Sequence, residues 1–142
     1  MALPQSELVT ALMTAYRADT TLQGLITGAV SPTWNIFDAV PTNQAFPVVV
    51  INSITGSVGT ALTMPYGKAN DLLVQIDIWS QRQGFKEAQA IASRIDTLTN
   101  EQSFSMVDFT NYMTLINNTM QMVEPDGLTR RVMLRYKFYT HG

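Results

Sequence analysis

The sequence predicts an α+β domain: a mainly antiparallel sheet of about four or five strands, with an N-terminal helix and a second amphipathic helix packed on one face. In residues 71–80, apolar side chains occupy every second position, as in a strand that has one face on a core. After Gly84, apolar residues recur at spacings of three and four, which places them on one stripe of a helix. That stripe consists of Phe85, Ala88, Ile91, Ala92, Ile95 and Leu98. Helix, strands, helix and strands in this order are typical of an α+β fold.

The N-terminal region predicts two helical segments on the same face of the sheet. The first is expected to have Ser6 as its N-cap and to end near Ala18. One of the residues from Asp19 to Thr21 is expected to cap a short second segment, which Gly28 ends in the left-handed conformation. The apolar residues at helical spacing in the two segments are Leu8, Val9, Leu12, Met13, Tyr16, Leu22, Leu25 and Ile26.

Four further stretches have strand patterns. Trp34, Ile36 and Phe37 form a short apolar stretch that Pro41 terminates, which predicts a short edge strand. Residues 46–54 are almost continuously apolar and β-branched, as expected of a central strand that is covered on both faces. After the second amphipathic helix, residues 104–109 are expected to form a short strand and residues 112–124 a longer one.

Residues 124–127, with the sequence EPDG, give the clearest turn signal in the chain. Proline sets φ near −65° and glycine tolerates a positive φ, so this turn is expected to join two antiparallel strands. The final strand alternates Val132, Leu134, Tyr136 and Phe138 on one face with Thr129, Arg131, Met133, Arg135 and Lys137 on the other. The sheet face that the helices leave uncovered is expected to carry Trp79, Arg131, Met133, Arg135 and Lys137.

Residues 55–69 contain three glycines and one proline and show no clear period. They form either a long loop or an irregular hairpin. A long connection in a compact domain is usually functional or mobile. Its apolar members, which would be unfavourable in water, are Val58, Leu62, Met64 and Tyr66.

The chain of 142 residues is expected to form a single domain, residues 1–142. Charged residues make up 14% of it, against about 25% in an ordinary soluble domain. This low value fits either extended protein contact or a merely polar surface. No apolar run approaches the roughly 20 residues of a membrane-spanning helix, and the N-terminus has no signal region, so we expect a soluble protein that is used without export.

The sequence predicts no catalytic residue, no cofactor and no metal site. It contains no cysteine and one histidine, His141, and it has neither a GxxxxGK[ST] nor a GxGxxG motif. Asp71 and Asp77 are interpreted as solvated or interface charges. The basic residues Arg130, Arg131, Arg135 and Lys137 have three interpretations: contact with a nearby DNA backbone, ion pairs with a neighbouring subunit, or a solvated strand face.

Several segments together resemble the tail completion, or head-to-tail joining, proteins of bacteriophages with long non-contractile tails, which are close to tail terminators. These segments are ADTTLQGLITG, IFDAVP, FPVVVI, IDIWSQRQGFKEAQAIASRI and EPDGLTRRVMLRYKF. They cover nearly the whole chain in order. The sequence departs from the family pattern in the insertion GAVSPTW and in its Met-rich segment between Asn100 and Asn118.

The resemblance implies a virion structural protein that is not an enzyme. It implies a homo-oligomeric ring, commonly a hexamer, at the head-proximal end of the tail tube, with the tail tube protein and a neck or head-closure protein as partners. Such a protein would be assembled in the host cytoplasm, would lie near packaged DNA and would contact no membrane. The alternative is a neck adaptor or head-closure protein of the same virion region. Residues expected at subunit contacts are Leu62, Met64, Tyr66, Trp79, Arg131 and Arg135.

Overall fold

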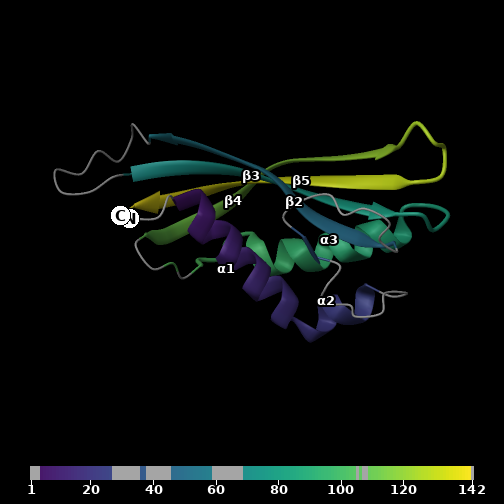
Figure 1. Ribbon diagram of the computed structural model, residues 1–142, viewed down its shortest axis with the longest axis horizontal. Helices are drawn as coiled ribbons and strands as arrows, with labels where there is room; N and C mark the ends of the chain where they lie inside the picture. Colours follow the sequence, from purple (N-terminus) through teal and green to yellow (C-terminus); the bar gives the residue numbers. More distant parts are fainter. Residues whose placement is uncertain are drawn as a thin grey trace.

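The computed structural model describes residues 4–26, 36–37, 46–58, 69–104, 106 and 109–141. Five strands form one sheet in the order β1-β2-β3-β5-β4, and three helices lie on one side of it (Figure 1). β1 runs parallel to β2, and the other neighbouring pairs are antiparallel. The elements are α1 (Pro4–Ala18), α2 (Thr20–Leu25), β1 (Ile36–Phe37), β2 (Val48–Val58), β3 (Ala69–Ser80), α3 (Lys86–Thr99), β4 (Thr110–Val123) and β5 (Arg130–His141). The predicted fold class is confirmed.

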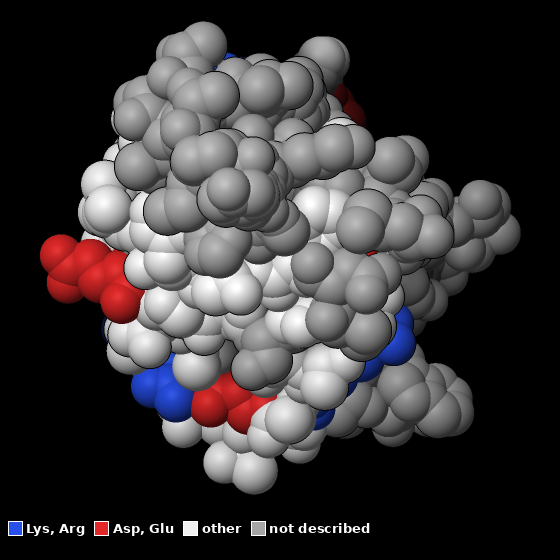
Figure 2. All heavy atoms as spheres, turned by 90° about the vertical axis from the view of Figure 1, so that its left-hand side faces the viewer, with Lys and Arg blue, Asp and Glu red and all other residues white. Residues whose placement is uncertain are grey.

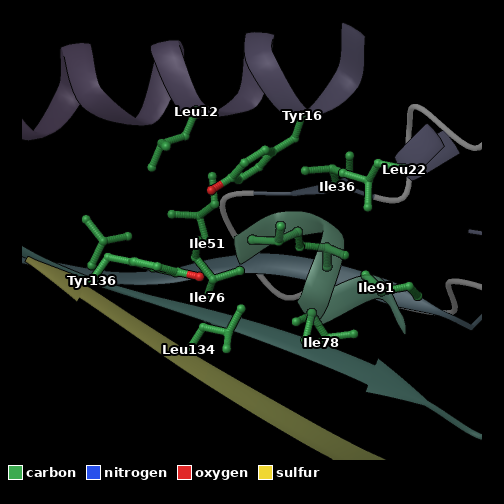
Figure 3. Packing of buried hydrophobic residues seen from close by; sticks show 14 of the residues in the cluster. Leu12, Tyr16, Leu22, Ile36, Ile51, Ile76, Ile78, Ile91, Leu134 and Tyr136 are labelled. Atoms are coloured by element: carbon green, nitrogen blue, oxygen red, sulfur yellow. The ribbon is translucent and has the colours of Figure 1, made fainter. Parts of the chain in front are cut away.

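The core lies between the helices and one face of the sheet. Leu12 and Tyr16 of α1 point toward Ile76 of β3 and Ile51 of β2 (Figure 3), and all four side chains are buried. The predicted stripe of α3 is also confirmed, since Ala88, Ile91, Ala92 and Ile95 are buried while Phe85 and Leu98 pack against the same cluster. Alternate residues of β3, from Leu72 to Ile78, complete the contact.

Two tyrosines bring polar groups into this core, and each has a hydrogen bond. The Tyr16 hydroxyl shares a bond of 2.5 Å with Oγ1 of Thr99, and the Tyr136 hydroxyl donates to Oδ1 of Asp96 at 2.7 Å. Burial raises the pKa of both hydroxyls above the usual value, so they stay neutral. Both bonds link α3 to another element of the fold, because Tyr16 belongs to α1 and Tyr136 to β5.

Asp19 fixes the junction between the helices. It is the N-cap of α2, within the predicted residues 19–21, and its Oδ2 accepts a hydrogen bond of 2.8 Å from the Leu22 amide. It also accepts two bonds from Arg94 of α3, at 2.9 and 2.7 Å. The hydrogen bond from Arg94 is the main cause that lowers the pKa of Asp19. One carboxylate therefore caps α2 and ties it to α3.

The predicted turn between β4 and β5 is also confirmed. The Gly127 amide donates to the Glu124 carbonyl at 2.9 Å, and Gly127 has a φ of 71°, a conformation that glycine adopts without steric cost. The carboxylate of Asp126 accepts bonds from the Leu128 and Thr129 amides and from the Thr129 hydroxyl. This turn sets the pairing of β4 with β5.

Two expectations about the boundaries of elements in the first half of the chain need correction. α1 begins at Pro4, so Ser6 is not its N-cap; proline suits a first helical turn, where its missing N–H has no partner to lose. The second strand runs to Val58 because its ladder with β3 continues past an irregularity between Ile51 and Ser53. Its continuation supports the irregular hairpin rather than a loop that starts at residue 55.

Residues 104, 106 and 109 are not in a strand, contrary to the prediction for residues 104–109. Phe104 and Met106 instead pack against the core cluster, and the Phe104 amide donates to Oδ1 of Asn111 at 2.9 Å. The edge strand before Pro41 is confirmed at Ile36 and Phe37. Trp34 and Gly28 lie outside the described residues.

Asp19→Ala is expected to lower the free energy of unfolding by about 1 kcal/mol through loss of the α2 cap alone. Because the pKa of Asp19 is lowered in the folded state, its contribution is present above the usual value of 3.8 and is lost as the pH falls through the folded value. Urea unfolding of the wild type and of Asp19→Ala, each at pH 7 and at pH 3, measures the difference in their free energies of unfolding. Asp19→Asn is the matched control, since it keeps a capping oxygen and removes the charge; equal stability of the Ala variant and the wild type at pH 7 would contradict the role of Asp19.

Candidate functional site

The sheet face opposite the helices is the first candidate surface, and we call it the outer sheet face. Side chains of paired residues in an antiparallel ladder point to the same face. Because Ile76 and Leu134 are a core pair, the neighbouring pairs Gln75 with Arg135 and Asp77 with Met133 lie on the outer face. Trp79 pairs there with Arg131. The fold thus brings together Trp79, Arg131 and Arg135, three of the residues predicted at subunit contacts.

Asp77 is a fully buried carboxylate at the centre of the outer sheet face. It accepts hydrogen bonds from Nε of Arg131 at 2.8 Å, from Nδ2 of Asn52 at 2.5 Å and from Nε2 of Gln75 at 3.2 Å. A buried charge is strongly unfavourable unless it is paired and hydrogen-bonded, and these donors meet that requirement. The interpretation of Asp77 as a solvated or interface charge is therefore wrong.

Arg131 has further partners in its own chain. Its Nη1 lies 3.7 Å from Oε1 of Glu124, and its guanidinium carbon lies 5.8 Å from the centre of the Trp79 ring. The hydrogen bond to Asp77 is the main cause that raises the pKa of Arg131. Nε1 of Trp79 is buried and has no hydrogen-bond partner within the described part of the chain. Arg131 of β5 is therefore held by two residues of β3 and by one residue of the turn.

The other basic residues of the outer sheet face are paired as well. Arg135 donates two bonds to Oε1 of Gln75, at 3.1 and 3.0 Å. Nζ of Lys137 lies 3.7 Å from the Asp71 carboxylate and 5.3 Å from the centre of the Tyr139 ring. Lys137 thus has a carboxylate partner in its own chain, whereas the partner of Arg135 is a neutral amide.

Arg130 does not belong to this group, contrary to the expected basic cluster of four residues. It lies next to Arg131 in β5 and so faces the helix side, where its guanidinium carbon is 5.9 Å from the centre of the Phe85 ring. The four cations therefore divide between two faces of the sheet.

The second candidate surface is β4, the strand at one edge of the sheet. Of its 14 residues only Asn111 and Thr114 are buried, and none carries a charge. Its exposed apolar residues, each 36% to 48% accessible, are Tyr112, Met113, Leu115, Ile116, Met120, Met122 and Val123. The paired positions show that Met120 and Met122 share the outer sheet face with Met133 and Arg131. Such a concentration of exposed apolar side chains marks an interaction surface.

Sequence reasoning did not select β4 as a candidate surface. A signal was present, because residues 110–123 combine a strand pattern with the complete absence of charged residues. By contrast, Leu62, Met64 and Tyr66, which were predicted at subunit contacts, lie outside the described residues. Figure 2 views the molecule from the left of Figure 1, and most of the described surface on this side is neutral (white) rather than charged (blue or red).

The described residues show no feature typical of a metal site or of a membrane-spanning helix. They contain no group of three or more His, Cys, Asp or Glu residues that could hold a metal ion. None of their helices is long and apolar enough to cross a membrane. A groove of about 770 Å³ lies between α1 and a group of residues after α3 that includes Gln102 and Phe104, and Glu7 is the one titratable side chain among its described lining residues. A single carboxylate provides no acid and base pair.

Two comparisons with known proteins found similarity. The sequence profile of the family described as tail completion protein gp17 matches residues 10–141. A chain in the solved structure "Virion of native gene transfer agent (GTA) particle" matches with a TM-score of 0.84 and 17% identity, over 100% of both chains. At this identity the structural match shows the fold alone. No curated protein sequence matches significantly.

Asp77→Ala is expected to lower the free energy of unfolding by about 2 to 3 kcal/mol, because it removes the buried carboxylate that three side chains share and leaves the partly buried, charged Arg131 without its main acceptor. Asp71→Ala is the matched control on the same strand and face; its ion pair with a well-exposed lysine should contribute under about 1 kcal/mol. Chemical denaturation of both variants measures the difference. Equal losses would show that Asp77 has no special role.

Proposed function

Because this chain belongs to the tail completion protein gp17 family, whose members are structural proteins of the phage tail, we propose that it forms a ring at the head-proximal end of a long non-contractile tail. In this position it ends the tail tube and joins it to the neck. Its partners are further copies of itself, the tail tube protein and a neck or head-closure protein. It acts in the virion, at the interface of head and tail, after assembly in the host cytoplasm.

The observation that carries this proposal is the family match over residues 10–141, nearly the whole chain. A ring of identical subunits uses two different patches of each subunit, and each stable contact buries at least about 1,000 Å². The outer sheet face and β4 offer two such patches, one with polar groups paired inside the subunit and one without charge. Neither patch requires an oppositely charged partner.

The partners of the basic residues also bear on whether the outer sheet face binds DNA. Arg131 and Lys137 have carboxylate partners in their own chain, and Arg135 has the Gln75 amide. DNA that passes through the proposed ring would have to displace these partners to bind the outer sheet face. We therefore assign this face to protein contact rather than to binding of a phosphate backbone.

Purified protein is expected to form closed rings, which negative-stain electron microscopy and native mass spectrometry would detect. The rings should co-sediment with isolated tails that lack heads. A protein that stays monomeric at high concentration, both alone and with tails, would contradict the proposal. Binding to isolated heads but not to tails would instead favour a neck adaptor or head-closure protein.

The double variant Met64→Ser and Tyr66→Ser is expected to weaken ring assembly while its monomer stays folded, because apolar side chains in this segment are proposed to contact a neighbouring subunit. The same segment provides a conservative control, Thr60→Ser with Thr63→Ser. Analytical ultracentrifugation measures assembly, and circular dichroism checks the fold. A double variant that assembles as the wild type does would remove residues 64 and 66 from the contact.

A further inference from the structure

Among the described residues, nothing covers the backbone edge of the second half of β4. In the first half, the groups that face away from β5 have partners at the end of α3: the Thr114 carbonyl accepts from the Glu101 amide at 2.7 Å, and the Ile116 amide donates to Oδ1 of Asn100 at 2.9 Å. These bonds show which residues of the strand point away from β5. They also cover this part of the edge.

In an antiparallel ladder, the backbone groups of successive residues point alternately toward the neighbouring strand and away from it. This alternation identifies the amides and carbonyls of β4 that have no partner strand in the described part of the chain. β5 has no irregularity against β3, so its odd-numbered residues, such as Lys137 and Met133, face β4 throughout. Beyond the register shift between Ile116 and Asn118, the residues whose amides and carbonyls point outward are then Thr119, Gln121 and Val123. No described residue outside the hairpin bonds to these backbone groups, and Gln89 reaches only the side-chain oxygen of Gln121.

This edge lacks most of the devices that keep strand edges apart. Natural edge strands are protected by lysine, by proline, by bulges or by a covering segment. Residues 117–123 contain no charge and no proline, and the register shift at their start is the single device that they show. Met120, Met122 and Val123 beside the edge are 45%, 38% and 48% exposed. An edge of this kind is built to pair.

The area of the surrounding surface fits a subunit contact. The seven exposed apolar side chains of β4, together with Leu128 in the turn, expose on the order of 600 Å². That value is at the upper end for a monomer and approaches the roughly 800 Å² that each partner buries in a standard interface. The strand β4 carries no charge, so the surface of the next copy that it meets needs no complementary charge.

We infer that residues 117–123 pair, through their outward amides and carbonyls, with the backbone of a second copy of this chain, which adds a strand to the sheet at each subunit contact. Backbone hydrogen bonds then hold the contact, and the exposed methionines pack on the neighbour and set its specificity. The inference rests on the proposed ring, because it names one of the two patches that each subunit would use.

Hydrogen exchange on the unmodified protein tests the pairing directly. The amides of Thr119, Gln121 and Val123 are expected to exchange slowly in the assembled protein and at least about tenfold faster in the dissociated subunit. The amide of Ile116, which is bonded inside the subunit, is the internal reference and should change little. Fast exchange at all three positions in an intact assembly would overturn the inference while the ring itself would stand.

Two variants test the same contact. Thr119→Pro removes one outward amide, and Met120→Lys with Met122→Lys places charge beside the edge; each should raise the dissociation constant of assembly at least about tenfold without unfolding the subunit. Ser93→Lys, on the exposed face of α3, is the control for added charge. Normal rings from both edge variants would overturn the inference. Rings that form normally but no longer bind tails would also overturn it, because the edge would then contact the tail tube protein and not a second copy. A wild-type protein that never assembles would overturn the inference together with the proposed function.

Discussion

The ion pair between Asp77 and Arg131 is the interaction on which the sheet depends on the face that its helices do not cover. Helices cover one face of the sheet, so the other face must satisfy its polar groups without a second layer. Asp77 does this at the centre of β3, because donors from β2, β3 and β5 converge on one carboxylate. The pair thus joins three adjacent strands through their side chains as well as through their ladders.

Because of these pairs within the subunit, β3 and β5 differ from β4 in how their side chains are used. Arg131, Arg135 and Lys137 use their charges to hold β5 against β3. β4 receives no such support from side-chain charges, and it contacts the rest of the sheet through β5 alone. Rigid, charge-paired strands therefore lie next to an uncharged strand with an open edge. In the proposed ring, the uncharged edge is the surface that accepts another copy.

Local signals in the sequence predicted most of the fold. The stripe of α3, the cap at Asp19 and the turn at Gly127 were correct because each depends on neighbouring residues and on backbone preferences. Partners distant in the chain were not predictable. Asp19 meets Arg94 across 75 residues, which depends on how α2 packs against α3. Asp77 meets Arg131 across 54 residues, which depends on a strand register that no local pattern encodes. The error about Asp77 follows from this, since alternation gives the face of a residue and not its partner.

The same reasoning explains why the candidate surface was only partly predictable. A residue can be placed on the outer face from its parity along the strand, as Trp79 and Arg135 were. Whether a strand lies at an edge depends on the order of strands in the sheet, and here β5, the last strand in sequence, inserts between β3 and β4. That insertion leaves β4 at the edge although β4 follows β3 directly in the order of strands along the chain. The uncharged sequence of β4 becomes informative only with this order in hand: in a central strand it would indicate burial, whereas at an open edge it indicates a partner.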